Sequence, residues 1–146
     1  MLKRKIDAFL LDWKNDANKK PLIIKGARQI GKTTSILEFA KNNYKYVVYI
    51  NFALMNEIKE LFNNKNVKSY EVDDLIKFIS FAKSGFEFVP NETLIFFDEI
   101  QEQPNCITSL KSFALDKRFD VICSGFLLGI NFKEHNIRHI GVGYIS

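Results

Sequence analysis

The sequence predicts an α/β fold, in which a parallel sheet of five strands lies between two layers of helices as a three-layer sandwich. Two patterns support this prediction: short, wholly apolar segments recur along the chain, and segments with helical periodicity separate them. Strands that are apolar along their whole length are typical of parallel sheets covered on both faces. The helices between them supply the crossover that a parallel strand pair requires.

The expected elements follow one another in a regular order. Strands are expected over residues 22–24, 46–52, 93–97, 119–124 and 140–145, where apolar and β-branched side chains cluster. Helices are expected over residues 2–13, 33–43, 54–62, 72–82 and 104–114, where apolar residues share one helical face. Residues 1–20 thus form an N-terminal helical segment, and Gly85 is the expected stop after the fourth helix. Residues 127–136 are ambiguous.

Composition favours one compact domain. The chain has 146 residues, of which 47% are hydrophobic and 26% charged, the balance of a globular protein with a real core. The net charge of +4 is spread along the chain, which is typical of a solvated surface and leaves nucleic-acid binding open. Cys106 and Cys123 form no CxxC pair, which fits a reducing, cytoplasmic setting. No apolar run reaches membrane-spanning length, so we expect no membrane association.

The first motif with chemical meaning directly follows the first predicted strand. It fits the phosphate-binding pattern G-x-x-x-x-G-K-[ST] with Gly26, Ala27, Arg28, Gln29, Ile30, Gly31, Lys32 and Thr33. Phosphates need several inward-facing backbone N–H groups, and the two glycines allow the loop to curl tightly enough to supply them. The following helix adds its N-terminal amides and the positive end of its dipole. We expect Lys32 to contact the β- and γ-phosphates of a nucleotide and Thr33 to bind Mg²⁺.

The second motif is a strand that ends in two acids, Asp98 and Glu99. This arrangement is typical of a Walker B strand, and we expect it to end beside the strand at residues 22–24. Asp98 would then face the water shell of Mg²⁺, and Glu99 would polarise the attacking water as general base. The alternative is an ordinary strand that ends in acids at a surface turn.

A third candidate is Ser124, which is followed by Gly125 at the end of the strand over residues 119–124. A small polar side chain at this position would hold the lytic water or the γ-phosphate. The alternative is a plain strand-to-turn Ser-Gly pair.

Together these motifs resemble a family of prokaryotic predicted ATPases in the AAA+ superfamily, the AAA_14 type. Residues 21–33, 97–101 and 124–130 carry the resemblance. Full-length members of that family have a C-terminal nuclease-like domain. The resemblance implies a P-loop NTPase of ASCE topology. This sequence departs from the family pattern at Phe126, where family members usually have a second serine.

The resemblance also implies roles for individual residues. It implies Glu99 as the hydrolytic base and Ser124 as the residue called sensor 1. ATP and Mg²⁺ would bind at Gly31, Lys32, Thr33, Thr34 and Asp98.

AAA+ ATPases complete their sites with an arginine from a neighbouring subunit, so the resemblance also implies a homo-oligomer. Arg138 lies before the last predicted strand, where such an arginine is usual, although a solvated surface arginine is the alternative. Since the sequence ends at Ser146, we expect residues 1–146 to be an AAA+ core without its helical lid, sensor-2 arginine and C-terminal domain.

The sequence is compatible with three functions. The first is ATP hydrolysis by in-line attack of water. The second is binding of ATP with negligible turnover, and the third is a P-loop kinase that transfers phosphate to a small molecule. The position of Glu99 directly after Asp98 favours activation of water over a kinase pocket.

Overall fold

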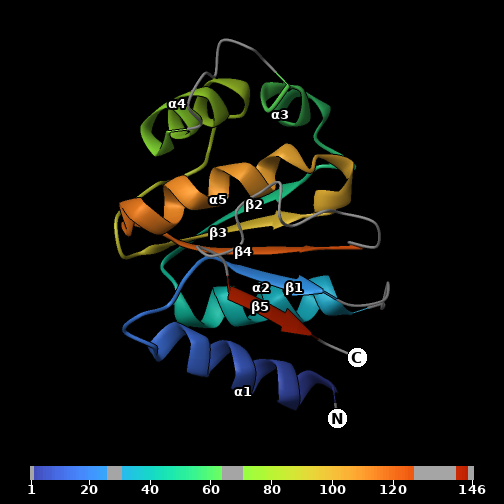
Figure 1. The fold of residues 1–146 in the computed structure, drawn as a ribbon, viewed down its shortest axis with the longest axis vertical. Helices are drawn as coiled ribbons and strands as arrows, with labels where there is room; N and C mark the ends of the chain where they lie inside the picture. Colours follow the sequence, from blue (N-terminus) through green and yellow to red (C-terminus); the bar gives the residue numbers. More distant parts are fainter. Residues whose placement is uncertain (1, 26–30, 64–70, 127–140, 145–146) are drawn as a thin grey trace.

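The computed structural model describes residues 2–25, 31–63, 71–126 and 141–144. Its centre is one parallel sheet of five strands, as predicted, and the strand order is β2-β3-β4-β1-β5 (Figure 1). The strands are β1 (Leu22–Lys25), β2 (Tyr46–Asn51), β3 (Thr93–Asp98), β4 (Asp120–Gly125) and β5 (Gly141–Tyr144). Because all five run in the same direction, their carboxyl ends share one edge of the sheet.

Helices cover both faces of the sheet (Figure 1). On one side lie α1 (Leu2–Asn15) and α2 (Lys32–Asn43). On the other side lie α3 (Asn56–Leu61), α4 (Val72–Ala82) and α5 (Asn105–Asp116). A short 3₁₀ turn, η1 (Ile100–Glu102), follows β3. The predicted three-layer architecture is therefore confirmed.

Side chains of the central strands alternate between two hydrophobic cores. In β3, Ile95 and Phe97 pack in the core beneath α3, α4 and α5, whereas Leu94 and Phe96 pack in the core beneath α1 and α2. All six residues of β3 are buried. This burial on both faces explains why the strand is apolar throughout, as expected for a parallel sheet. By the same alternation, Asp98 lies on the face that α2 covers.

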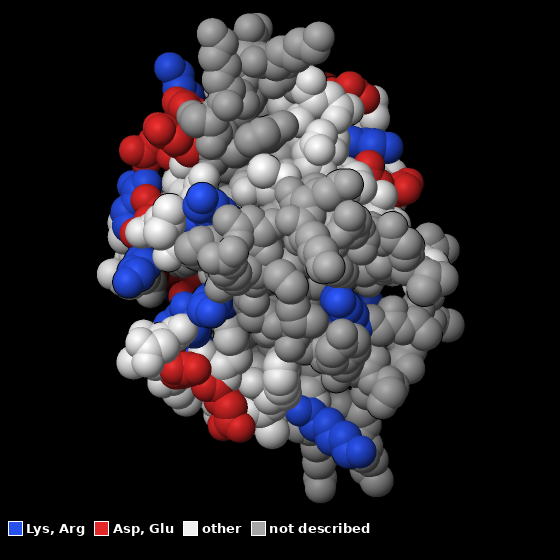
Figure 2. All heavy atoms as spheres, viewed as in Figure 1, with Lys and Arg blue, Asp and Glu red and all other residues white. Residues whose placement is uncertain are grey.

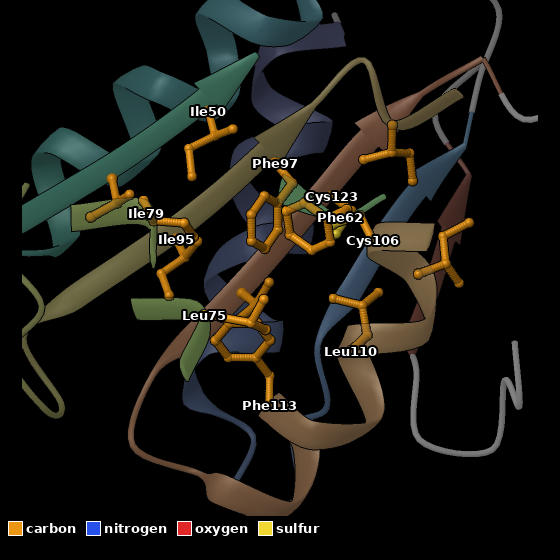
Figure 3. Packing of buried hydrophobic residues seen from close by; sticks show 14 of the residues in the cluster. Ile50, Phe62, Leu75, Ile79, Ile95, Phe97, Cys106, Leu110, Phe113 and Cys123 are labelled. Carbon is orange, nitrogen blue, oxygen red and sulfur yellow. The ribbon is translucent and has the colours of Figure 1, made fainter. Parts of the chain in front are cut away.

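The larger core is built around Phe97, whose ring is fully buried among other aromatic rings (Figure 3). Ring centroids lie 5.7 Å away at Phe52, 6.1 Å at Phe62 and 6.1 Å at Phe113. Aromatic pairs at these separations add to the free energy gained from burial. The cluster therefore fixes the position of β3, and with it the acids at the end of that strand.

Two expectations need correction. First, β3 does not end beside β1, because β4 pairs with both strands and lies between them. Apolar periodicity predicts strands but carries no information on their order in the sheet. Second, Gly85 is not the helix stop. Helix α4 ends at Ala82 with the extended residue Lys83 as its C-cap, and Gly85, with φ of 97°, lies in the following turn.

The ambiguous residues 127–136 lie outside the described part of the chain. Among the described residues, no helix combines the length and the apolar character needed to cross a membrane. Basic and acidic side chains are intermixed over the described part of the face seen in Figure 2. Nucleic-acid binding and a cytoplasmic location stay predictions.

Candidate functional site

The candidate residues meet at the carboxyl edge of the sheet. Parallel pairing aligns Ile24 of β1 with Ser124 of β4 and aligns Asn51 of β2 with Asp98 of β3. Helix α2 begins at this edge with Lys32. Sequence segments that are far apart in the chain, around residues 32, 98 and 124, are thereby brought together by the strand order.

The start of α2 presents Lys32 to this edge. Gly31, the residue before it, adopts φ of 98°, a left-handed conformation that a side chain would strain. The Lys32 side chain is only 7% exposed. Burial lowers the pKa of its ammonium group, and the charges of Asp98 and Glu99 oppose that shift. Burial of an ammonium group is costly, so a further negative charge at this edge would stabilise it.

Asp98 is buried but well provided with hydrogen-bond donors. The Thr33 hydroxyl donates to Asp98 Oδ2 at 2.8 Å, and the Tyr49 hydroxyl donates to the same oxygen at 2.7 Å. The backbone N–H of Glu99 donates to Asp98 Oδ1 at 2.8 Å. These donors offset the loss of hydration of the carboxylate. Thr33 and Asp98, which the sequence assigns to Mg²⁺, thus lie in contact, and their role in binding the metal stays a prediction.

Glu99 follows in an unusual backbone conformation, with φ of 56° and ψ of 46°. Left-handed backbone at a residue other than glycine is uncommon and often marks a functional site. It turns the chain from β3 into η1. The Glu99 carboxylate accepts a hydrogen bond from Gln101 Nε2 at 2.7 Å.

Ser124 is fully buried at the end of β4. Among the described residues, its hydroxyl has no hydrogen-bond partner. It lies one residue before Gly125, which pairs with Lys25, the last residue of β1. Ser124 thus lies beside the end of β1, the strand that the glycine-rich motif follows in the sequence.

Thr34, Arg138 and the rest of the glycine-rich motif complete the predicted set. Thr34 is an exposed residue of the first turn of α2. Residues 26–30, which carry most of the glycine-rich motif, lie outside the described residues, as does Arg138.

Sequence reasoning missed three polar residues at this edge: Tyr49, Asn51 and Gln101. Tyr49 contacts Asp98 directly, and Asn51 Nδ2 donates to the Tyr49 hydroxyl at 3.2 Å. Desolvation and the hydrogen bond to Asp98 raise the pKa of Tyr49 to about 12. One signal in the sequence could have identified Tyr49 and Asn51. They alternate with the buried Val48 and Ile50 near the end of β2, so they project from the opposite face of that strand.

Comparison with known proteins agrees with this geometry. The chain matches the AAA_14 family, described as an AAA domain, over residues 18–140. No curated protein matches. Among solved structures, the chain is similar to PCH-2 of C. elegans, with a TM-score of 0.54 and 15% sequence identity. The match covers 99% of this chain and 42% of that one, and at this identity it shows the fold alone.

The family match and the fold together define a P-loop nucleotide-binding module of the AAA+ superfamily. Within that superfamily, the chain belongs to the AAA domain family AAA_14.

Proposed function

We propose that this module binds ATP together with Mg²⁺ and hydrolyses ATP. The observation that carries the proposal is the contact between the Thr33 hydroxyl and Asp98 Oδ2 at 2.8 Å, beside the buried Lys32. The hydroxyl and the ammonium group come from the first turn of α2, and the carboxylate comes from the end of β3. That set matches the needs of a nucleotide polyphosphate and its metal ion.

The donor set fits Mg²⁺ in particular. This ion prefers oxygen ligands, and it is commonly held by one or two protein oxygens together with phosphates and water. Thr33 and Asp98 would hold it, the latter directly or through water. When bound, Mg²⁺ neutralises negative charge on the β- and γ-phosphates.

The remaining residues supply the other parts of the reaction. Lys32 would bind the β- and γ-phosphates, whose charge offsets the cost of its burial. Glu99 would orient a water molecule and accept its proton during in-line attack on the γ-phosphate. Ser124 would hold the lytic water or a γ-phosphate oxygen.

Nucleotide binding is tested by titrating ATP, with Mg²⁺ present, into the wild-type chain and Lys32→Ala. Loss of a buried charged contact costs about 1.5–3 kcal/mol, so the affinity should fall about 10- to 100-fold. Lys41→Ala, on the last turn of the same helix, is the matched control and should bind as wild type does. Equal affinity of Lys32→Ala and wild type would refute the binding site.

Hydrolysis is tested by phosphate release from wild type and Glu99→Gln. Loss of a general base should slow turnover by about 10²- to 10⁴-fold while ATP still binds. Glu102→Gln, at an exposed residue of η1, is the matched control. If wild type and Glu99→Gln release phosphate equally slowly, the module binds ATP without turnover. If phosphate appears on an added small molecule instead, the kinase alternative is correct.

Assembly forms a separate part of the proposal. AAA+ modules often act as oligomers, and we infer that Arg138 would complete the site of a neighbouring copy. Specific activity should then rise with protein concentration, and Arg138→Ala should abolish that rise without weakening ATP binding. Activity per subunit that is independent of concentration would count against assembly.

A further inference from the structure

Gln101 connects two parts of the site that the sequence places far apart. Its side-chain Nε2 donates to Glu99 Oε2 at 2.7 Å, and its Oε1 accepts from the backbone N–H of Phe126 at 3.0 Å. Phe126 follows Ser124 and Gly125 at the end of β4. One amide group therefore joins the Glu99 carboxylate to the segment that carries Ser124.

The surrounding backbone fits closely around this amide. A Cβ atom on Gly125 would lie 2.5 Å from Gln101 Oε1 and 2.9 Å from the backbone nitrogen of Ile100. Only glycine therefore allows η1 to approach the end of β4 at this distance. The left-handed backbone of Glu99 starts the turn that brings Gln101 back toward the Glu99 carboxylate.

The two ends of the amide have different chemical requirements. The contact to Phe126 needs only an acceptor oxygen, which a carboxylate also offers. The contact to Glu99 needs an N–H donor, because an ionised carboxylate only accepts hydrogen bonds. Among uncharged side chains of this length, only glutamine supplies both groups.

We propose that Gln101 is a positioning residue that sets the orientation of the Glu99 carboxylate and couples it to the Ser124–Phe126 segment. This inference rests on the proposed hydrolysis of ATP. A shift of the backbone after Ser124, on engagement of the γ-phosphate, would reach Glu99 through the Gln101 amide. The residue acts on turnover, and nucleotide binding through Lys32 and Thr33 does not depend on it.

The test compares two substitutions that divide these roles. Gln101→Glu keeps an acceptor for Phe126 but removes the donor to Glu99, whereas Gln101→Ala removes both. A misplaced catalytic group costs up to about 100-fold in rate. We therefore expect both variants to lower kcat about 10- to 100-fold with unchanged KM for ATP. Hydrogen exchange of the Phe126 amide should accelerate in Gln101→Ala and remain near the wild-type rate in Gln101→Glu.

A double-variant cycle then separates positioning from simple structural support. In a Glu99→Gln background, Gln101→Ala should cause no further loss in single-turnover hydrolysis, because its effect passes through Glu99. A full additional loss in that background overturns the inference, as does a wild-type kcat for Gln101→Glu. If the wild-type rate does not depend on Glu99 at all, the proposed hydrolysis fails and this inference with it. A rate that depends on Glu99 but not on Gln101 overturns this inference alone.

Discussion

Replacement of Tyr49 by phenylalanine probes the hydrogen bonds that hold Asp98. The substitution removes the hydroxyl that donates to Asp98 Oδ2 at 2.7 Å and keeps the ring, whose centroid lies 5.2 Å from that of Phe96. No apolar contact is lost, so the change in stability reports the two hydrogen bonds of the hydroxyl: the strong one to Asp98 and the longer one, at 3.2 Å, that it accepts from Asn51 Nδ2.

The expected magnitude follows from the partners that remain. A hydrogen bond to a charged group contributes about 1.5–3 kcal/mol to stability. In Tyr49→Phe, Asp98 keeps the Thr33 hydroxyl on Oδ2 and the Glu99 N–H on Oδ1, so the carboxylate is not left without donors. We therefore expect the lower end, a loss of about 1.5 kcal/mol, or roughly a tenfold change in the unfolding equilibrium constant.

Urea denaturation at neutral pH measures this loss, because a domain of this size is expected to unfold in one cooperative transition. Tyr46→Phe is the matched control. It lies on the same strand, and within the described residues its hydroxyl has no hydrogen-bond partner. If Tyr49→Phe and Tyr46→Phe have the same free energy of unfolding and the same m-value, the hydrogen bond from the Tyr49 hydroxyl to Asp98 is refuted.

Two further predictions concern the same strand and the core. The pKa of Tyr49 is raised to about 12, so the folded state holds this proton more tightly than the unfolded chain. Stability from this group is complete below about pH 10 and is lost as the pH rises toward 12. Tyr49→Phe should lack that loss, and it should also lack the tyrosinate absorbance step near pH 12; burial raises the pKa of Tyr44 further still, so Tyr44 titrates later. Phe97→Ala should cost about 3–5 kcal/mol in urea unfolding, whereas Phe81→Ala, at a side chain 94% exposed, should change stability by under about 0.5 kcal/mol.

The three-layer architecture could be predicted from the sequence because strands and helices leave local patterns in the order of apolar and polar residues. A wholly apolar run such as β3 is buried on both faces, and helical periodicity marks the covering layers. The sequence also indicated that Thr33 and Asp98 belong to one site, since the residue types and their positions at strand and helix ends limit the chemistry; their direct contact is a finding of the structure. Strand order was not predictable by the same means. The insertion of β4 between β1 and β3 depends on long-range packing, which local periodicity does not record.

Tyr49 and Gln101 were missed for the same reason, because their contacts depend on long-range packing. A tyrosine in a strand is typical of packing, and only the register of β2 against β3 brings the Tyr49 hydroxyl to Asp98. A shift of one residue would turn that side chain to the opposite face. Gln101 depends on two long-range facts, the left-handed turn at Glu99 and the close approach of Gly125. Neither follows from residue type alone.

The electrostatics of this edge give a reason for its proposed preference for a polyphosphate. Burial disfavours the charged form of Lys32, and Asp98 and Glu99 only partly oppose that effect. Among the described residues, the Asp98 oxygens accept hydrogen bonds from Thr33, Tyr49 and the Glu99 N–H rather than from the ammonium group. A triphosphate would bring the missing negative charge to Lys32 and leave the contacts of Asp98 in place. On this reasoning, affinity should fall from ATP to ADP to AMP, because each lost phosphate removes charge that stabilises the buried cation.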